Sequence, residues 1–268
     1  MKKNENSIGI LDSGSGGLSV YREIKKQLPQ EHVIYFGDTF YSPYGGKKEQ
    51  QIFERVKIIL EYLIAQNIKT IIIACNTADV ITLNMLQDIY EFPLFGVILP
   101  GVIEAISATK NKRIAIIGTE VTIRSKIHTQ LINKINPSIA VFTNPCNNQI
   151  IKEMEENSLK DVEKITVLIK ECLNPFKNKN IDTLLLGCTH YPFLRKYIKK
   201  ECKSDINIVD PAGFTVKQVS YWLAKNNLFN SFKDLPDLFY ISGNPDIFLE
   251  TATNLLGYKP GEIKKIDI

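Results

Sequence analysis

Two cysteines of the 268-residue chain stand where a thiol could transfer protons. Cys75 ends a β-branched run at residues 70–74 and opens the polar segment NTAD, which is rich in helix-capping residues. Cys188 ends a second apolar run and is followed by Thr189 and His190. A helix N-terminus favours the thiolate form of a cysteine, and an imidazole can accept or hold the thiol proton. The sequence therefore predicts two reactive thiols; the alternative for each is a buried, inert cysteine that packs as a small apolar side chain.

A third polar motif, DSGSGG at residues 12–17, follows an apolar run near the N-terminus. A dinucleotide-binding fold would carry GxGxxG directly after a strand and an acid about 20 residues later. Ser19 stands in the place of the third glycine, although Asp38 could bind a ribose. The better interpretation is a turn whose amides, with the Ser13 hydroxyl, bind a small anion at a helix start. Asp12 would project into the same crevice as an acid, a base or a ligand of an ammonium group.

The elements that must position these motifs indicate an α/β fold. Apolar runs at residues 8–11, 33–36, 70–74 and 113–117 alternate with amphipathic segments such as residues 52–63. Such runs are typical of strands buried on both faces, and their alternation with helices predicts mostly parallel sheets. Two such series occur. Each places a cysteine at the carboxyl end of a strand, which is the edge where open α/β sheets bind ligands.

Composition argues against several classes of protein. The 33 basic and 29 acidic residues are scattered and leave a net charge of +4, so we expect no nucleic-acid or membrane partner. No apolar segment follows the charged N-terminus, and the apolar stretch at residues 92–103 is too short and too broken to span a bilayer. We therefore expect a cytoplasmic protein.

The other cysteines and histidines show no pattern of a metal site. They are dispersed, without the spacing of zinc ligands, so no metal is expected. Cys146, Cys172 and Cys202 are predicted to be reduced thiols with structural or surface roles, because the cysteines are odd in number and form no C-x-x-C pair. His32 and His128 are predicted to be structural.

Two thiols that face each other across a cleft suggest a particular reaction. One thiolate is sufficient for nucleophilic hydrolysis, so a second thiol would have no evident task in a hydrolase. Two thiols do have a task when a proton is removed from one face of a carbon atom and returned to the other face. Positioning and carbanion stabilisation would then supply most of the rate, and helix starts could bind substrate carboxylates. The arrangement therefore suggests a racemase or epimerase.

The motifs around these residues resemble those of the glutamate racemases, within the aspartate/glutamate racemase family. The matching segments are LDSGxGG at 11–17, GDT at 37–39, PYG at 43–45, ACNTA at 74–78 and LGCTHYP at 186–192. The resemblance covers nearly the whole chain. It implies a cofactor-independent enzyme, commonly a homodimer, that supplies D-glutamate for bacterial peptidoglycan. It also implies two pseudosymmetric α/β domains with the active site in the cleft between them. On this pattern we expect a first domain of residues 1–98 and 212–230, and a second of residues 99–211 and 231–268.

The resemblance also implies roles for individual residues. Cys75 would exchange the α-proton on the D-glutamate face with help from Asp12, and Cys188 would do so on the L-glutamate face with help from His190. The implied substrate contacts are Asp12, Ser13, Tyr44, Gly45, Asn76, Thr77, Thr119, Thr189 and His190.

Some positions depart from the family pattern. The family usually has a small residue at the place of Asp79, a glutamate at that of Leu99, and threonine or proline at that of Gly46. The stretch that leads to a functional glutamate also differs, so we expect Glu155 to support His190, with Glu153 as the alternative.

Three other functions stay open from the sequence. An aspartate or broad-specificity racemase is the nearest one, although aspartate racemases more often carry an acidic residue at the place of His190. A thiol hydrolase would use Cys188 and His190 and would not need Cys75. A two-domain amino-acid-binding module would need neither thiol.

Overall fold

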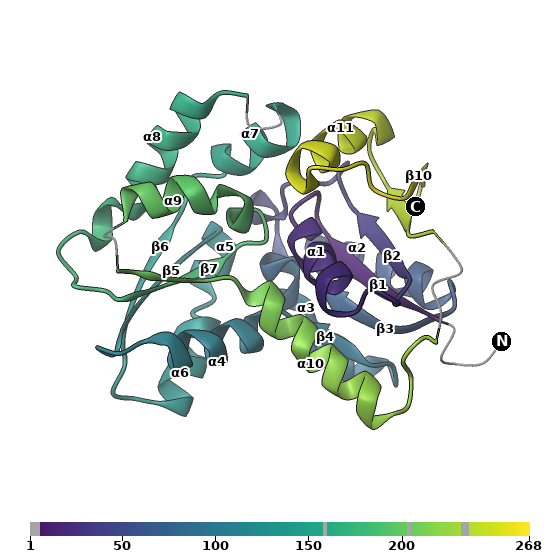
Figure 1. Ribbon diagram of the computed structural model, residues 1–268, viewed down its shortest axis with the longest axis horizontal. Helices are drawn as coiled ribbons and strands as arrows, with labels where there is room; N and C mark the ends of the chain where they lie inside the picture. Colours follow the sequence, from purple (N-terminus) through teal and green to yellow (C-terminus); the bar gives the residue numbers. More distant parts are fainter. Residues whose placement is uncertain (1–5, 158–159, 203–204, 232–235) are drawn as a thin grey trace.

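The computed structural model describes residues 6–157, 160–202, 205–231 and 236–268, which form two parallel β-sheets flanked by helices (Figure 1). The first sheet has six strands in the order β10-β9-β2-β1-β3-β4, and the second has four in the order β6-β5-β7-β8. Every paired strand runs parallel to its neighbour. The strands are β1 Ser7–Asp12, β2 Val33–Gly37, β3 Ile68–Ile73, β4 Leu94–Gly96, β5 Arg113–Gly118, β6 Ala140–Pro145, β7 Thr183–Gly187, β8 Asn207–Val209, β9 Leu238–Ile241 and β10 Glu262–Lys265.

Helices cover both sheets. α10 packs against α1, which follows β1 of the first sheet, and against α4, which packs on β7 of the second sheet. The α-helices are α1 Leu18–Gln27, α2 Glu49–Ile64, α3 Asn76–Ile89, α4 Ile98–Ala108, α5 Glu120–Arg124, α6 Ile127–Ile135, α7 Gln149–Asn157, α8 Val162–Leu173, α9 Arg195–Glu201, α10 Pro211–Lys225 and α11 Pro245–Leu256. Short 3-10 turns lie at Tyr44–Gly46, Asn174–Phe176 and Tyr191–Leu194. Within the described ranges, none of these helices has the length and apolar character that crossing a membrane requires.

The central strands form because both of their faces are buried in apolar cores. In β1, Ile8 and Ile10 join the core on one side of the first sheet, and Leu11 joins the core on the other side. In β7, Leu184 and Leu185 divide in the same way between the two cores of the second sheet. Successive side chains of a strand point to opposite faces, so a strand between two cores is mostly apolar on both faces rather than alternating. The prediction of an α/β fold with parallel sheets is confirmed.

The C-terminal strands do not lie where the sequence analysis placed them. β9 pairs with β2, and β10 with β9, so both extend the first sheet. The assignment of residues 231–268 to the second domain is therefore wrong for these strands. In Figure 1, the yellow C-terminal segment accordingly lies beside the purple N-terminal strands. The chain first passes from one sheet to the other between β4 and α4. β4 still pairs with β3, whereas α4 packs on β7 of the second sheet.

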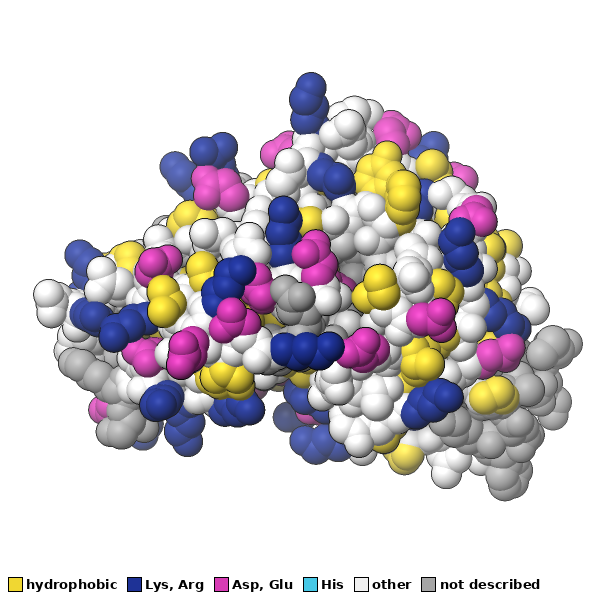
Figure 2. All heavy atoms as spheres, turned by 90° about the horizontal axis from the view of Figure 1, so that it is seen from above, with side chains coloured by type: hydrophobic (Ala, Val, Ile, Leu, Met, Phe, Trp, Pro, Cys, Tyr) yellow, Lys and Arg dark blue, Asp and Glu magenta, His cyan; other side chains and the backbone are white. Residues whose placement is uncertain are grey.

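The surface seen in Figure 2 carries acidic and basic side chains side by side, in keeping with the small net charge of +4.

Candidate active site

Two free cysteines approach one cavity from the two sheets. Cys75 follows β3 and is the N-cap residue of α3, while Cys188 directly follows β7; each side chain is only 6% exposed. The residues that line the cavity include ten of those predicted from the sequence: Ser13, Tyr44, Gly45, Cys75, Asn76, Thr77, Thr119, Cys188, Thr189 and His190. Pro43, Ile151 and Gly187 complete its wall.

Cys75 is held as a thiol in this closed cavity. Its Sγ donates to the Ser13 hydroxyl oxygen over 3.5 Å. Burial, followed by the nearby charge of Asp12, raises the pKa of the Cys75 thiol to about 12, although the hydrogen bonds to Ser13 and to the Ala78 backbone oppose this shift. The expectation that the helix start would favour the thiolate is therefore wrong for the closed state, because desolvation outweighs it.

Cys188 belongs to a chain of three groups with His190 and Glu155. The Cys188 Sγ lies 3.8 Å from His190 Nδ1, and His190 Nε2 donates to Glu155 Oε1 over 2.6 Å. Burial alone would lower the pKa of His190, but the hydrogen bonds to Cys188 and Glu155 and the charge of Glu155 raise it well above its usual value. Burial likewise opposes ionisation of Glu155, yet His190 and Ser15 bring the pKa of this carboxyl below its ordinary value. The pair is therefore an imidazolium and a carboxylate.

The structure distinguishes the two acids of α7. Glu155 contacts His190, whereas Glu153 pairs with Lys164 and accepts from Gln149 Nε2 over 2.9 Å.

Asp12 ends β1, is fully buried and, unlike the other predicted substrate contacts, does not line the cavity. Its Oδ1 accepts from the Gly14 N–H over 2.9 Å, and its Oδ2 accepts from the Thr189 hydroxyl over 3.0 Å. Burial raises the pKa of Asp12, although the charge of His190 and these two hydrogen bonds act against the rise. Asp12 is therefore a buried acid that links the first sheet to the loop of Cys188.

The glycine-rich loop at residues 12–17 does hold an anion, but that anion is part of the protein. The Ser15 N–H and hydroxyl donate to Glu155 Oε1 over 2.7 and 3.1 Å. A Cβ on Gly16 would lie 2.5 Å from both His190 Nδ1 and Thr189 Oγ1, so only glycine permits this approach. Ser15 was not predicted to be a site residue, although it lies inside the motif.

The dinucleotide interpretation fails at Asp38. This carboxylate is fully buried and accepts from the Arg55 guanidinium over 2.7 and 2.9 Å, and from the Tyr44 and Ser242 hydroxyls over 2.7 Å each. No face of Asp38 is left for a ribose. The hydroxyl of Tyr44 is also committed to this contact.

Further polar side chains of the site come from the start of α3 and from α5 with its N-cap residue. The Thr77 hydroxyl lies 2.9 Å from that of Thr119, which in turn lies 3.0 Å from Thr122 Oγ1. Thr122 was not predicted. Asn76 is almost completely buried, and within the described residues its Oδ1 has no hydrogen-bond partner.

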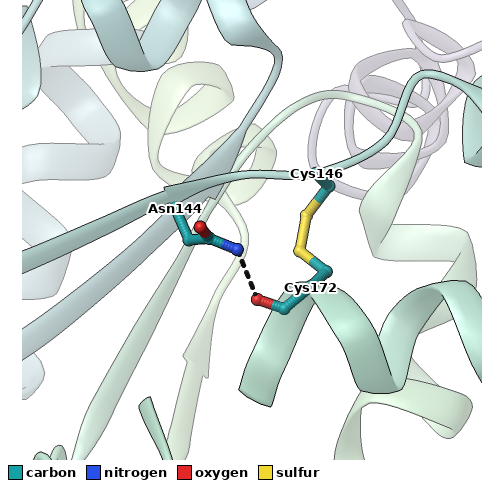
Figure 3. Close-up of a disulfide and its surroundings, with 3 residues drawn as sticks. All are labelled: Asn144, Cys146 and Cys172. Atoms are coloured by element: carbon teal, nitrogen blue, oxygen red, sulfur yellow. Dashed lines mark hydrogen bonds between the residues drawn. A yellow bond between two sulfur atoms is a disulfide. The ribbon is translucent and has the colours of Figure 1, made fainter. Parts of the chain in front are cut away.

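Cys146 and Cys172 form a disulfide, with Cα atoms 5.0 Å apart (Figure 3). The prediction that both are reduced thiols is therefore wrong; the spacing of their Cα atoms lies within the range for such bonds. Asn144 Nδ2 also donates to the Cys172 carbonyl over 2.8 Å. Together these contacts tie the segment before α7 to the end of α8. Cys202 is free and partly exposed.

The remaining predictions concern metals and histidines. Over the described ranges, no cluster of three or more potential metal ligands occurs. His32 contacts the Ser7 hydroxyl and the Pro236 carbonyl, and His128 is buried, which lowers its pKa to about 4. Neither lines the cavity.

Comparison with known proteins relates this geometry to a family. The model of the Asp/Glu/Hydantoin racemase family matches residues 8–219. The chain belongs to this racemase family. Among its relatives, the glutamate racemase of Trichormus variabilis is 38% identical over 253 residues, covering 94% of this chain and 85% of the relative.

Solved structures of this racemase family have the same architecture. The glutamate racemase isoform RacE1 of Bacillus anthracis superposes with a TM-score of 0.93 at 35% identity, covering 98% of each chain. The Francisella tularensis glutamate racemase, solved in complex with D-glutamate, gives a TM-score of 0.90 at 33% identity, again covering 98% of each chain.

Proposed function

We propose that this chain is a glutamate racemase that interconverts L- and D-glutamate by proton transfer between two cysteines, without a cofactor. The observation that carries the proposal is that two free thiols, Cys75 and Cys188, reach one buried cavity from two different sheets. The likeness to glutamate racemases over nearly the whole chain supports this substrate.

In the proposed reaction, the two sulfurs exchange protonation states. With L-glutamate bound, a Cys188 thiolate removes the α-proton and becomes a thiol, while the Cys75 thiol delivers its proton to the opposite face and becomes a thiolate. D-glutamate is converted by the reverse transfers. The imidazolium of His190 beside Cys188 and the raised pKa of Cys75 suit the first of these states.

The polar lining of the cavity suits an amino-acid substrate. Asn76 Oδ1, which has no hydrogen-bond partner in the described part of the chain, is an acceptor for an ammonium group. The hydroxyls of Ser13, Thr77, Thr119 and Thr189 are donors within the same cavity, and can turn toward a carboxylate. Asp12 would assist Cys75, and Glu155 would assist Cys188 by holding His190 in place.

We further propose that the enzyme works in the cytoplasm as a homodimer and supplies D-glutamate for peptidoglycan synthesis. The location, the oligomeric state and the role in peptidoglycan synthesis are inferred from the resemblance to glutamate racemases.

Circular dichroism of L-glutamate and of D-glutamate incubated with the protein tests the proposal. Both signals should decay to zero without added cofactor, and Cys75→Ser and Cys188→Ser should each abolish the decay. Cys202→Ser is the matched control and should racemise as the wild type does, because Cys202 lies outside the cavity. Near wild-type decay in either active-site variant would overturn the two-thiol assignment, and faster turnover of L-aspartate would overturn the substrate.

A further inference from the structure

Asp79 is a buried acid close to the site but outside the cavity lining. It lies in the first turn of α3, where its N–H donates to the Cys75 carbonyl over 2.8 Å. Its carboxylate points the other way: Asp79 Oδ2 accepts from the Val97 and Ile98 N–H groups over 2.7 and 2.8 Å. The side chain is 5% exposed. Asp79 therefore joins the helix that begins at Cys75 to the start of α4.

The start of α4 relies on this contact. Its N-cap residue, Val97, makes no side-chain capping bond, and the first turn of α4 contains no acid of its own. The first N–H groups of a helix have no partner within the helix, and a negative charge near them is stabilising. Asp79 supplies the acceptor for two of them from a neighbouring helix.

The fit around Asp79 is also sterically close. A Cβ on Gly96 would lie 2.3 Å from Asp79 Oδ1, so the carboxylate sits directly against the backbone. Gly96 is the last residue of β4 in the first sheet, and α4 follows within two residues. Asp79 thus binds the backbone at the point where the chain leaves the first sheet.

From there, α4 leads to the second thiol. Val102 and Ala105 of α4 share a buried core cluster with Leu185 of β7. β7 ends at Gly187, directly before Cys188. A continuous path of short contacts therefore runs from the Cys75 carbonyl through Asp79 and α4 to the strand that presents Cys188.

We propose that Asp79 is a positioning residue, which holds α4 against α3 and thereby fixes the spacing of the Cys75 and Cys188 thiols. The inference rests on the proposed function, because it concerns the distance between two sulfur atoms that act on opposite faces of one substrate carbon. Reacting groups tolerate little displacement, and a shift of 1 Å can reduce a rate on the order of 100-fold.

Three variants at this position test the proposal. Asp79→Ala removes the acceptor and should lower kcat for L-glutamate at least tenfold, with a smaller change in KM. Asp79→Asn retains an oxygen acceptor of the same size and should stay within about threefold of wild type. Asp79→Glu keeps a carboxyl group, but its extra methylene has no room beside Gly96, so its kcat should fall nearly as far as that of Asp79→Ala. If Asp79→Ala does not fold, the contrast between Asn and Glu carries the test.

Asp182→Ala is the matched control. The Asp182 carboxylate also accepts from two backbone N–H groups, those of Lys110 and Asn111 over 2.6 and 2.7 Å, but it does so beyond the far end of α4. Its loss should lower the melting temperature and leave kcat within twofold of wild type. The proposal is overturned if Asp79→Ala keeps kcat within twofold of wild type, or if Asp182→Ala reduces kcat equally. A wild-type protein that does not racemise glutamate would refute the proposed function instead.

Discussion

Glu153 and Glu155 stand two residues apart on α7 and serve different partners. Two positions on a helix are separated by about 200°, so the two side chains point to nearly opposite sides. The sequence could therefore predict that one of them reaches His190, but not which one, because the rotation of α7 is set by its packing. Cys75 and Cys188 were easier to predict, since each lies within two residues of the end of an apolar strand. The raised pKa of Cys75 could not be predicted, because it depends on burial by residues from both sheets.

Replacement of Glu155 should weaken the half of the site that contains Cys188. In Glu155→Gln, His190 loses its charge partner, so the pKa of His190 should fall toward its ordinary value. The proton NMR titration of the histidine ring should show this shift, and racemisation should slow by about 10-fold to 100-fold. Glu153→Gln is the control on the same helix and should change neither quantity. Equal slowing in both variants would contradict the assignment of Glu155.

Asp79 should also affect how the free energy of unfolding depends on pH. Burial raises the pKa of Asp79 to about 7, even though its bonds to Ile98 and Val97 lower it. The unfolded chain releases this proton near its ordinary pKa of 3.8, so between pH 4 and 7 the folded state binds more protons. The free energy of unfolding of the wild type should therefore fall over this range relative to that of Asp79→Asn, by up to about 4 kcal/mol. Urea unfolding of both proteins measures the difference; a constant difference would show that Asp79 titrates normally.

At the scale of elements, the strands and the loops differ in how well they could be predicted. The strands β1 and β3 could be recognised because both of their faces are buried, which makes the middle of each strand mostly apolar. The loop at residues 12–17 was expected to bind a small anion with the Ser13 hydroxyl, whereas its Ser15 binds a carboxylate of the protein itself. That the anion is Glu155 of α7 could not be predicted, because it depends on how elements distant in sequence meet.

The loop at residues 12–17 lies so close to Thr189 and His190 that one added methyl group should strongly reduce the rate of racemisation. Gly16→Ala would place a Cβ 2.5 Å from His190 Nδ1 and Thr189 Oγ1, which must move the loop away from Cys188. Racemisation should fall at least tenfold in the circular dichroism assay. Gly213→Ala is the control, because its nearest neighbour would be 3.7 Å away and alanine favours the helix by roughly 1 kcal/mol. Full activity of Gly16→Ala would show that the loop is not closed during turnover.

The disulfide joins α8 to the segment before α7 and should be detectable by thiol counting. A denatured sample prepared without reductant should titrate three thiols, and a reduced one should titrate all five cysteines. The paired positions are 26 apart in the sequence, and chain-entropy arguments for such a loop give a loss of about 3.5 kcal/mol in the free energy of unfolding on reduction. Five reactive thiols in both samples would restore the interpretation as free cysteines.

At the scale of the whole molecule, the strands from the two ends of the chain lie in one sheet. β9 and β10 are short, and exposed positions in β10 hide the apolar pattern that marks a buried strand. β9 pairs with β2, which lies far away in the sequence, and β10 joins the sheet only through β9, so no local signal could assign them to the first sheet. The prediction of two α/β units was sound for the central strands and failed at this edge.

On the ribosome, the two sheets would be completed in the reverse of their order along the chain. The four strands of the second sheet have all been synthesised once Val209 is added. β2 must wait for β9, about 200 residues later, or on the order of 10 to 40 s at ordinary rates of synthesis. Until then the outer edge of β2 offers unpaired N–H and C=O groups to any other strand. The segment that contains β9 and β10 therefore protects the edge of β2. A nascent protein that stops before residue 238 should have a complete second sheet, but a first sheet whose unpaired edge can pair with other strands.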